Sequence, residues 1–310
     1  MDRGMYKIVI IKRRTRLEEL KRRYNTIEQA KFYVEHLGAD FNDYILEHEN
    51  YYAALDRVRA NAEMYARVQE IDREYIPNMI FGKEDVVVAV GQDGLVANTM
   101  KYLDGQPLIG VNPDVKRWDG QLLPFEAREM GTVLPKVLVG NYSERKVTMG
   151  KAETKDGQVL YSVNDFFVGI NNHTSARYNI QYNNVIENQS SSGVIISTGL
   201  GMTGWHRSVM AEFQGMARAF NMGEIKMPEY QWDSDVLVFQ VREPYPSRFT
   251  EAGLVYGEVG REDTLTFVSN MAENGIVFSD GILEDAIEFN AGMELKISVS
   301  ERMGRLVTAC

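Results

Sequence analysis

The sequence contains a single cysteine, four histidines and no long uncharged apolar run. The single cysteine, Cys310, allows no internal disulfide and no thiolate cluster, so we expect a cytoplasmic protein. No two histidines have the close spacing of a zinc site, which disfavours a histidine-based metal centre. No apolar run approaches the roughly 18 residues that a spanning helix needs, and the N-terminal stretch lacks a signal-peptide core, so we expect no membrane association.

The sequence also has fewer basic than acidic residues, and its formal net charge is -10 at pH 7. An acidic chain disfavours a nucleic-acid surface, which needs a basic face to displace counterions from phosphates. The exception is the basic stretch Lys12, Arg13, Arg14 and Arg16. A solvated loop or helix start is favoured there over an RNA or phosphate site.

What the sequence does have is enough apolar residues for two hydrophobic cores: 44% of its 310 residues are hydrophobic. Up to about residue 125, apolar runs alternate with helical patterns. Leu55, Val58, Ala62, Tyr65 and Val68 predict one face of a helix. A strand at residues 86–90, a helix at 96–103 and a strand at 107–111 then predict a βαβ unit with a parallel sheet.

Beyond residue 130 the pattern changes to short apolar stretches separated by turns. Asp156-Gly157 between two such stretches is typical of a β-hairpin. Further strands are expected at residues 194–197, 236–241, 265–269, 275–278 and 295–299. The sequence therefore predicts an α/β half with a Rossmann-like parallel sheet, followed by an all-β half.

A tight turn, Gly91-Gln92-Asp93-Gly94, joins the buried strand at 86–90 to its helix. The free N–H groups at the start of a helix attract anions, and Gly91 and Gly94 would let a phosphate approach the backbone. Asp93 would repel a phosphate unless it binds Mg²⁺ or accepts a proton. The alternative is an ordinary strand-to-helix turn with Asp93 as the helix cap.

A second glycine-rich stretch, residues 197–205, follows the strand at 194–197. It combines hydroxyl side chains with small residues and ends at Trp205, whose indole offers a flat apolar surface. This composition favours a nucleotide site. The alternative is a glycine-rich connection with Trp205 in the core.

These stretches together resemble the NAD kinase family. The family's G-G-D-G-T motif looks like residues 91–95, its Asn-Glu pair looks like Asn164-Asp165, and its S-T-P-T-G-S-T-A-Y segment looks like residues 197–205. The strings IGVNPDVKRWDGQLLP, QVREPYPSRF and VFSDG are most similar to the mitochondrial-type branch.

The resemblance implies an ATP- and Mg²⁺-dependent kinase that phosphorylates the 2′-hydroxyl of the adenosine ribose of NAD to give NADP. It implies an α/β domain at residues 1–128, to which about 287–310 return, and an all-β dinucleotide-binding domain at 129–286. The nucleotide sites would lie between the domains, and the protein would be a homodimer or homotetramer.

The resemblance also implies the site residues. Asp93 would be the catalytic base, and the phosphates of ATP would contact Gly91, Gln92, Gly94 and Leu95. The implied NAD-binding set is Asn164, Asp165, Ser192, Thr198, Thr203, Trp205 and Ser208. No protein side chain is expected as a direct metal ligand.

The chain departs from the family pattern at several of these positions. Gln92 replaces a glycine, Leu95 a threonine, Ser192 an aspartate and Trp205 a tyrosine. These changes keep two alternatives open. One is a kinase of the same superfamily that acts on a sugar, nucleoside or lipid hydroxyl, and the other is a non-catalytic NAD(P)-binding sensor.

Overall fold

The computed structural model describes residues 6–223, 226 and 228–309. The chain divides into two compact units: unit 1 comprises residues 1–145 and 305–310, and unit 2 comprises residues 146–304. Strands β6 (Ser143–Thr154) and β17 (Glu294–Thr308) carry the chain from one unit to the other. The domain boundaries expected from the sequence stay predictions.

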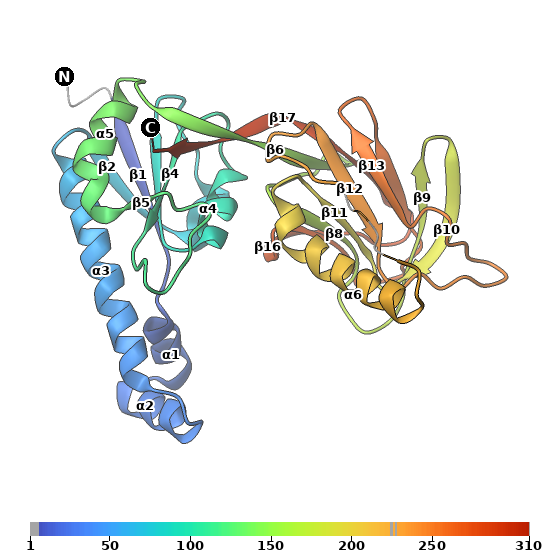
Figure 1. The fold of residues 1–310 in the computed structure, drawn as a ribbon, viewed down its shortest axis with the longest axis horizontal. Helices are drawn as coiled ribbons and strands as arrows, with labels where there is room; N and C mark the ends of the chain where they lie inside the picture. The colour runs from blue at the N-terminus through green and yellow to red at the C-terminus, as the bar shows by residue number, and fades with distance from the viewer. Residues whose placement is uncertain (1–5, 224–225, 227, 310) are drawn as a thin grey trace. The chain divides into compact units, whose positions relative to one another are not determined.

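Unit 1 is built on a parallel sheet (Figure 1). Its strands lie in the order β4, β3, β1, β2, and both β5 and the end of β17 pair with β4. The bounds are β1 (Lys7–Lys12), β2 (Arg67–Asp72), β3 (Val86–Val90), β4 (Leu108–Asn112) and β5 (Phe125–Glu126). All five residues of β3 are buried, which explains its unbroken apolar run.

The predicted βαβ unit is confirmed. β3 and β4 are parallel, with Val88 opposite Ile109, and α4 (Asp93–Met100) connects them. The helix begins three residues before the predicted start at 96, because Gln92 already has the extended backbone of an N-cap.

Long helix α3 (Phe41–Glu63) packs one face against the sheet through Tyr51, Leu55, Val58 and Ala62. The prediction that this helix includes Tyr65 and Val68 is wrong. The helix ends at Glu63, and Val68 lies in β2 opposite Ile8 of β1. Hydrogen bonding to β1 therefore decides the conformation of Val68, and its helical spacing does not.

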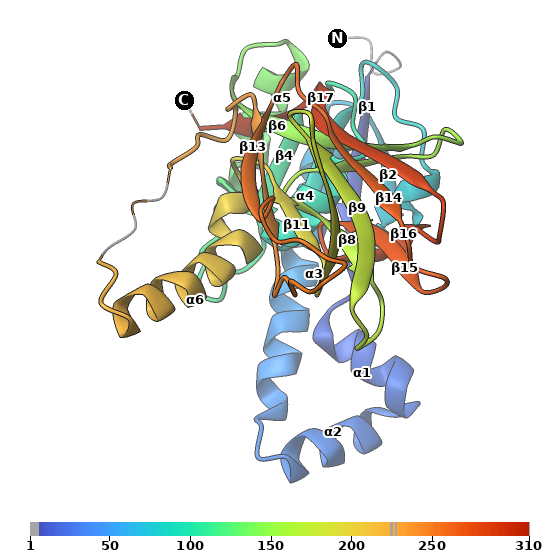
Figure 2. The ribbon, with the colours of Figure 1, turned by 90° about the vertical axis from the view of Figure 1, so that its right-hand side faces the viewer.

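Two short helices, α1 (Arg16–Tyr24) and α2 (Ile27–His36), pack beside the first half of α3 (Figure 2). They share a small core made of Leu17, Ala30, Val34 and Phe41. Thr15 caps α1 in a reciprocal capping box with Glu18. The remaining helical pieces of unit 1 are η1 (Arg73–Asn78), η2 (Ala127–Glu129) and α5 (Met130–Leu138).

Unit 2 contains two groups of strands around one core. One group runs β10, β9, β14, β17, and β6 pairs with both β17 and β7; the other is a six-stranded antiparallel sheet in the order β13, β12, β11, β8, β15, β16. Aromatic side chains from both groups meet in the core, among them Phe166, Tyr178, Phe239 and Phe267. Figure 2 shows β9 and β14, which pair antiparallel.

The strands of unit 2 have the following bounds: β7 (Val159–Ser162), β8 (Asp165–Ile170), β9 (Ala176–Tyr182), β10 (Val185–Ser191), β11 (Val194–Ser197), β12 (Val236–Val241), β13 (Tyr256–Gly260), β14 (Leu265–Ser269), β15 (Gly275–Ser279) and β16 (Ile282–Glu288). A short turn, η3 (Gly201–Thr203), leads into helix α6 (Trp205–Ala219). The hairpin at Asp156-Gly157 is confirmed, since β6 and β7 pair antiparallel around it.

An α/β unit followed by a β-rich unit is thus the observed fold class, as the sequence predicts. The strand expected at residues 295–299 is part of the much longer β17.

Candidate functional site

The turn between β3 and α4 places Asp93 at the first position of the helix. Gln92 is the N-cap, and no side chain caps the helix, so Asp93 is not the cap that one interpretation of the sequence supposed. Its carboxylate instead accepts the backbone N–H of Leu122 at 2.7 Å and of Gln121 at 3.3 Å. Each carboxylate oxygen still has a lone pair available for another donor.

The first turn of α4 leaves two backbone donors free. The N–H groups of Leu95 and Val96 donate to the carbonyl of Gln92. Among the described residues, none accepts a hydrogen bond from the N–H of Asp93 or Gly94. Gly94 is exposed, and a Cβ placed on it would meet nothing within 4 Å. The helix start therefore offers free N–H groups next to open space, which suits an anion.

Gly91 and Leu95, the first and last residues of the motif at 91–95, have structural roles. Leu95 is only 4% exposed, because this position of α4 faces the core. A Cβ on Gly91 would lie 2.9 Å from Cδ2 of Leu95. A methyl group at position 91 would therefore crowd Leu95, whose side chain packs in the core.

The basic stretch at the end of β1 is neutralised by carboxylates. Arg13 and Arg16 both bind Glu47, at 2.9 and 2.6 Å. Lys12 pairs with Asp72, and Arg14 pairs with Glu74. Burial would raise the pKa of Glu47, but hydrogen bonds from Arg16 and Arg13 outweigh it and hold the pKa below its ordinary value. The stretch is thus a structural ion-pair network.

In unit 2, the structure brings Asn164, Asp165 and Thr198 together. Thr198 is buried, donates its hydroxyl to the carbonyl of Val163 at 2.6 Å, and donates its N–H to the carbonyl of Asn164 at 2.9 Å. A Cβ on Gly201 would lie 1.9 Å from the same Asn164 oxygen. The glycine-rich stretch at 197–205 is therefore packed directly on the Asn164 turn.

Asp165 is buried beside a second carboxylate. Burial, and then the negative charge of Asp280, raise its pKa to about 7. Asp280 lies in the turn between β15 and β16 and was not expected to belong to the site. The signal in the sequence was its Asp-Gly dipeptide, which is typical of a hairpin turn.

Trp205 stacks on two phenylalanines. Its ring centroid lies 5.6 Å from Phe167 and 6.3 Å from Phe278, with interplanar angles of 17° and 12°. The guanidinium of Arg242 lies over the indole at 5.5 Å. Trp205 is half-buried, so this aromatic stack combines a packing role with a partly accessible flat surface.

The remaining predicted NAD-binding residues are less closely grouped. Thr203 and Ser208 are exposed near the start of α6, and the hydroxyl of Thr203 donates to the carbonyl of Leu200. Ser192 precedes β11, whose opposite end carries Ser197 beside Asp165. The structure thus separates Ser192 from Asp165 by the length of that strand.

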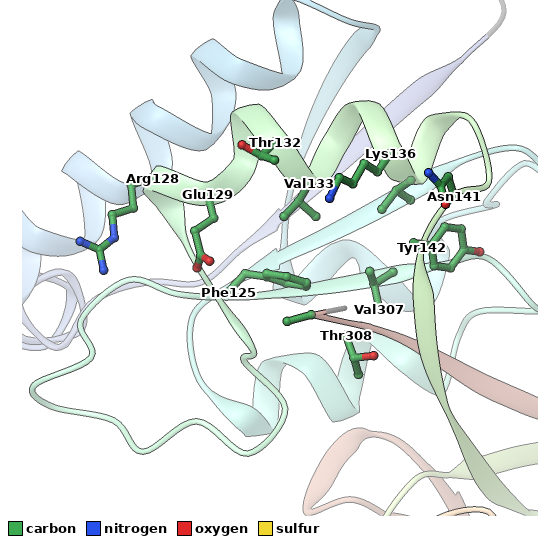
Figure 3. A pocket seen from close by; sticks show the side chains of 12 residues that line it. Phe125, Arg128, Glu129, Thr132, Val133, Lys136, Asn141, Tyr142, Val307 and Thr308 are labelled. Carbon is green, nitrogen blue, oxygen red and sulfur yellow. The ribbon is translucent and has the colours of Figure 1, made fainter.

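A further pocket lies in unit 1, between β5, α5 and the end of β17 (Figure 3). Phe125, Val133, Val137 and Val307 supply its apolar lining, and Lys136 is exposed at its edge. None of the site residues predicted from the sequence lines this pocket.

Residues 6–223, 226 and 228–309 contain no group of three or more His, Cys, Asp or Glu side chains arranged to hold a metal ion. Within the same residues, no helix has both the length and the apolar character needed to cross a membrane.

Among known proteins, the chain is similar to solved structures, and these support the fold. No family model matches the chain, and no curated protein matches it. The yeast NADH kinase, solved in complex with NADH, matches with a TM-score of 0.58 and 14% identity, over 98% of this chain and 84% of that chain. An NAD kinase from Archaeoglobus fulgidus, solved in complex with ATP, matches with a TM-score of 0.55 and 16% identity, over 97% of this chain and 93% of that chain.

These likenesses extend over nearly the whole chain. At this level of identity they establish the class of fold, which is the two-part architecture of an α/β unit and a β-rich unit that these two kinases have.

Proposed function

We propose that this chain is an NAD kinase, which transfers the γ-phosphoryl group of ATP to the 2′-hydroxyl of the adenosine ribose of NAD. The observation that carries the proposal is the match of 98% and 97% of the chain to an NADH kinase and an NAD kinase. The motifs at residues 91–95, 164–165 and 197–205 add support. Membership of the mitochondrial-type branch is part of the proposal.

Unit 1 would bind the phosphates of ATP. The free N–H groups of Asp93 and Gly94 at the start of α4 are suited to phosphate oxygens, and Gly94 has no side chain to obstruct them. Mg²⁺ would neutralise charge on the phosphates, with phosphate oxygens and water among its ligands.

Asp93 is the residue assigned to proton transfer. The 2′-oxygen of NAD forms a bond to the γ-phosphorus while the bond from that phosphorus to the β,γ-bridging oxygen breaks. The proton of the 2′-hydroxyl passes to Asp93, and the products are NADP and ADP. Hydrogen bonds from Gln121 and Leu122 fix the orientation of the carboxylate for this step.

Unit 2 would bind the dinucleotide. The side chains of Asn164 and Asp165 make no hydrogen bond within the described residues, so they remain available for ribose hydroxyls. Trp205 offers part of its ring to a planar base. Thr198 would support the site indirectly. Its hydroxyl is already bonded to the carbonyl of Val163, so it holds the backbone next to Asn164 and does not contact the ligand itself.

The proposal also includes the localisation, the assembly and the partners of the enzyme. We infer a cytoplasmic homodimer or homotetramer whose partners are small-molecule nucleotides, without nucleic-acid or membrane binding.

The direct test is NADP formation by the purified protein with ATP, Mg²⁺ and NAD. Formation of NADP and ADP in equal amounts is the expected result. Phosphoryl transfer to a sugar, nucleoside or lipid but not to NAD would favour another acceptor. Saturable NAD binding with no ATP consumption would identify a sensor.

A further inference from the structure

The turn between β15 and β16 directs the carboxylate of Asp280 onto one short segment, residues 162–165. Oδ1 accepts the N–H of Asn164 at 2.6 Å, the N–H of Asp165 at 3.3 Å and the hydroxyl of Ser162 at 3.2 Å. Oδ2 accepts the N–H of Val163 at 3.0 Å. The N–H of Asp280 in turn donates to the carbonyl of Asp165 at 2.9 Å.

The turn itself does not need this carboxylate. Asp280 and Gly281 have φ values of 53° and 72°, the left-handed pair that a two-residue hairpin turn requires. Asparagine or glycine would satisfy the same backbone conformation. The four bonds accepted by the carboxylate therefore serve the segment at 162–165, which lies more than a hundred residues earlier in the chain.

The opposite side of this segment is held as well. Thr198 binds the carbonyl oxygens of Val163 and Asn164, while Asp280 binds the N–H groups of Val163, Asn164 and Asp165. The backbone is thus restrained through both its donors and its acceptors. The hydroxyl of Ser197, which lies opposite Asp165 in the register of β8 and β11, is buried without a partner.

We propose that Asp280 is a positioning residue of the dinucleotide site, which holds Asn164 and Asp165 so that their side chains meet hydroxyl groups of the ligand. The inference rests on the proposed function, because it takes NAD as the ligand. A restrained backbone that leaves two polar side chains unbonded is the arrangement expected of a preorganised site.

Asp280 also affects the charge of its neighbour. Its carboxylate accepts four hydrogen bonds from residues 162–165, and its negative charge acts on Asp165 from the β15–β16 turn. From β11, Asp165 faces the neutral Ser197, and Asp280 is the one charged group among the described residues that shifts its pKa. With its pKa raised to about 7, Asp165 is protonated in a large share of molecules near neutral pH. It can then donate a hydrogen bond without repelling a diphosphate.

The positioning role is tested first without ligand. NMR measures amide hydrogen exchange at Val163, Asn164 and Asp165 in the wild type and in Asp280→Asn, which keeps a residue suited to the turn. We expect exchange at least about tenfold faster in the variant, and a smaller increase in Ser162→Ala. The matched control is Asp263→Asn, because Asp263 accepts the N–H of Gly260 in the turn between β13 and β14 and makes no bond to residues 162–165. Unchanged exchange in Asp280→Asn would overturn the proposal.

The affinity for NAD, measured at several pH values, tests whether the protonation of Asp165 affects binding. Because protonated Asp165 is the donor, wild-type affinity should fall as the pH rises through about 7. In Asp280→Asn the fall in affinity should move to lower pH, and in Asp165→Asn the dissociation constant should no longer depend on pH in this range. A pH profile that is the same in Asp280→Asn and the wild type would contradict this role. A fall in affinity through pH 7 that persists in Asp165→Asn would equally contradict it.

The two proposals fail separately. If the wild type does not bind NAD, the proposed function is wrong, and the ligand-free exchange experiment still decides whether Asp280 holds the segment.

Discussion

Leu122 donates its backbone N–H to Oδ1 of Asp93 at 2.7 Å, and this bond ties the start of α4 to the loop that follows β4. The same loop rests on Gly110 of β4, where a Cβ would lie 2.0 Å from the carbonyl oxygen of Leu122. The orientation of the proposed catalytic base therefore depends on a glycine in the neighbouring strand.

Asp93→Asn is expected to lower kcat for NADP formation by about 10²- to 10⁴-fold, since an amide cannot take the proton of the 2′-hydroxyl. NAD affinity should remain, because the binding residues assigned to NAD lie in unit 2. Steady-state kinetics and calorimetry check both points. The control is Asp119→Asn, a change of an exposed carboxylate in the nearby loop. Comparable kcat in Asp93→Asn and the wild type would refute general-base catalysis by this residue.

Gly94→Ala separates phosphate binding from folding. The added methyl group meets no protein atom within 4 Å, so the melting temperature should not fall, while the KM for ATP should rise several-fold. Gly91→Ala should instead destabilise the fold by about 1–3 kcal/mol, because its Cβ would crowd Leu95. Thermal unfolding and ATP kinetics on both variants measure this contrast. An unchanged KM for ATP in Gly94→Ala would place the phosphates elsewhere.

Thr198→Val should lower the free energy of unfolding by about 1–3 kcal/mol, because the buried carbonyl of Val163 and the N–H of Gly201 lose their partner. Thr198→Ser keeps the hydroxyl and should retain most of that stability. Urea unfolding monitored by tryptophan fluorescence distinguishes the two. Equal stability of the two variants would show that the hydroxyl contributes nothing.

Glu47→Gln should destabilise unit 1 by about 3 kcal/mol at neutral pH, because it removes the charge that Arg13 and Arg16 share. The pKa of Glu47 is lowered in the folded state, so its stabilisation is present above the ordinary value of 4.5 and is lost as the pH falls through the folded-state value. The difference between variant and wild type should therefore shrink in acid.

Denaturant unfolding at several pH values measures that difference. The control is Glu19→Gln, which removes an exposed partner of Arg14 and should cost under about 1 kcal/mol. A loss of stability in Glu47→Gln that is equal in acid and at neutral pH would show that pairing is not its source.

Local patterns predicted much of this fold. The strand of unbroken apolar residues at 86–90 and the strands at 194–197, 236–241 and 265–269 have the bounds expected from sequence. Most residues of these strands are buried, so the apolar pattern in the sequence is enough to predict where each strand lies. Val68 shows the limit, because its spacing suits a helix while pairing with β1 makes it a strand.

The candidate site was predicted less completely. A sequence motif does not show which way each side chain points, and it does not show contacts between residues far apart in the chain. A motif of five residues does not reveal that Leu95 faces the core while Gly94 faces open space. Asp280 was missed because its partners lie 115 to 118 residues away in the chain. Only the pairing of β8 with β15 brings them together.

The course of β17 has a consequence for synthesis on the ribosome. Its last residues, from Arg305 onward, belong to unit 1, where Leu306 pairs with Leu108 and Arg305 binds Glu144 and the carbonyl of Gly105. Until those residues emerge, this edge of β4 lacks its final partner while all of unit 2 is being translated. While unit 2 is translated, the nascent chain therefore carries a sheet edge that only β5 partly covers, which is the kind of surface that chaperones protect.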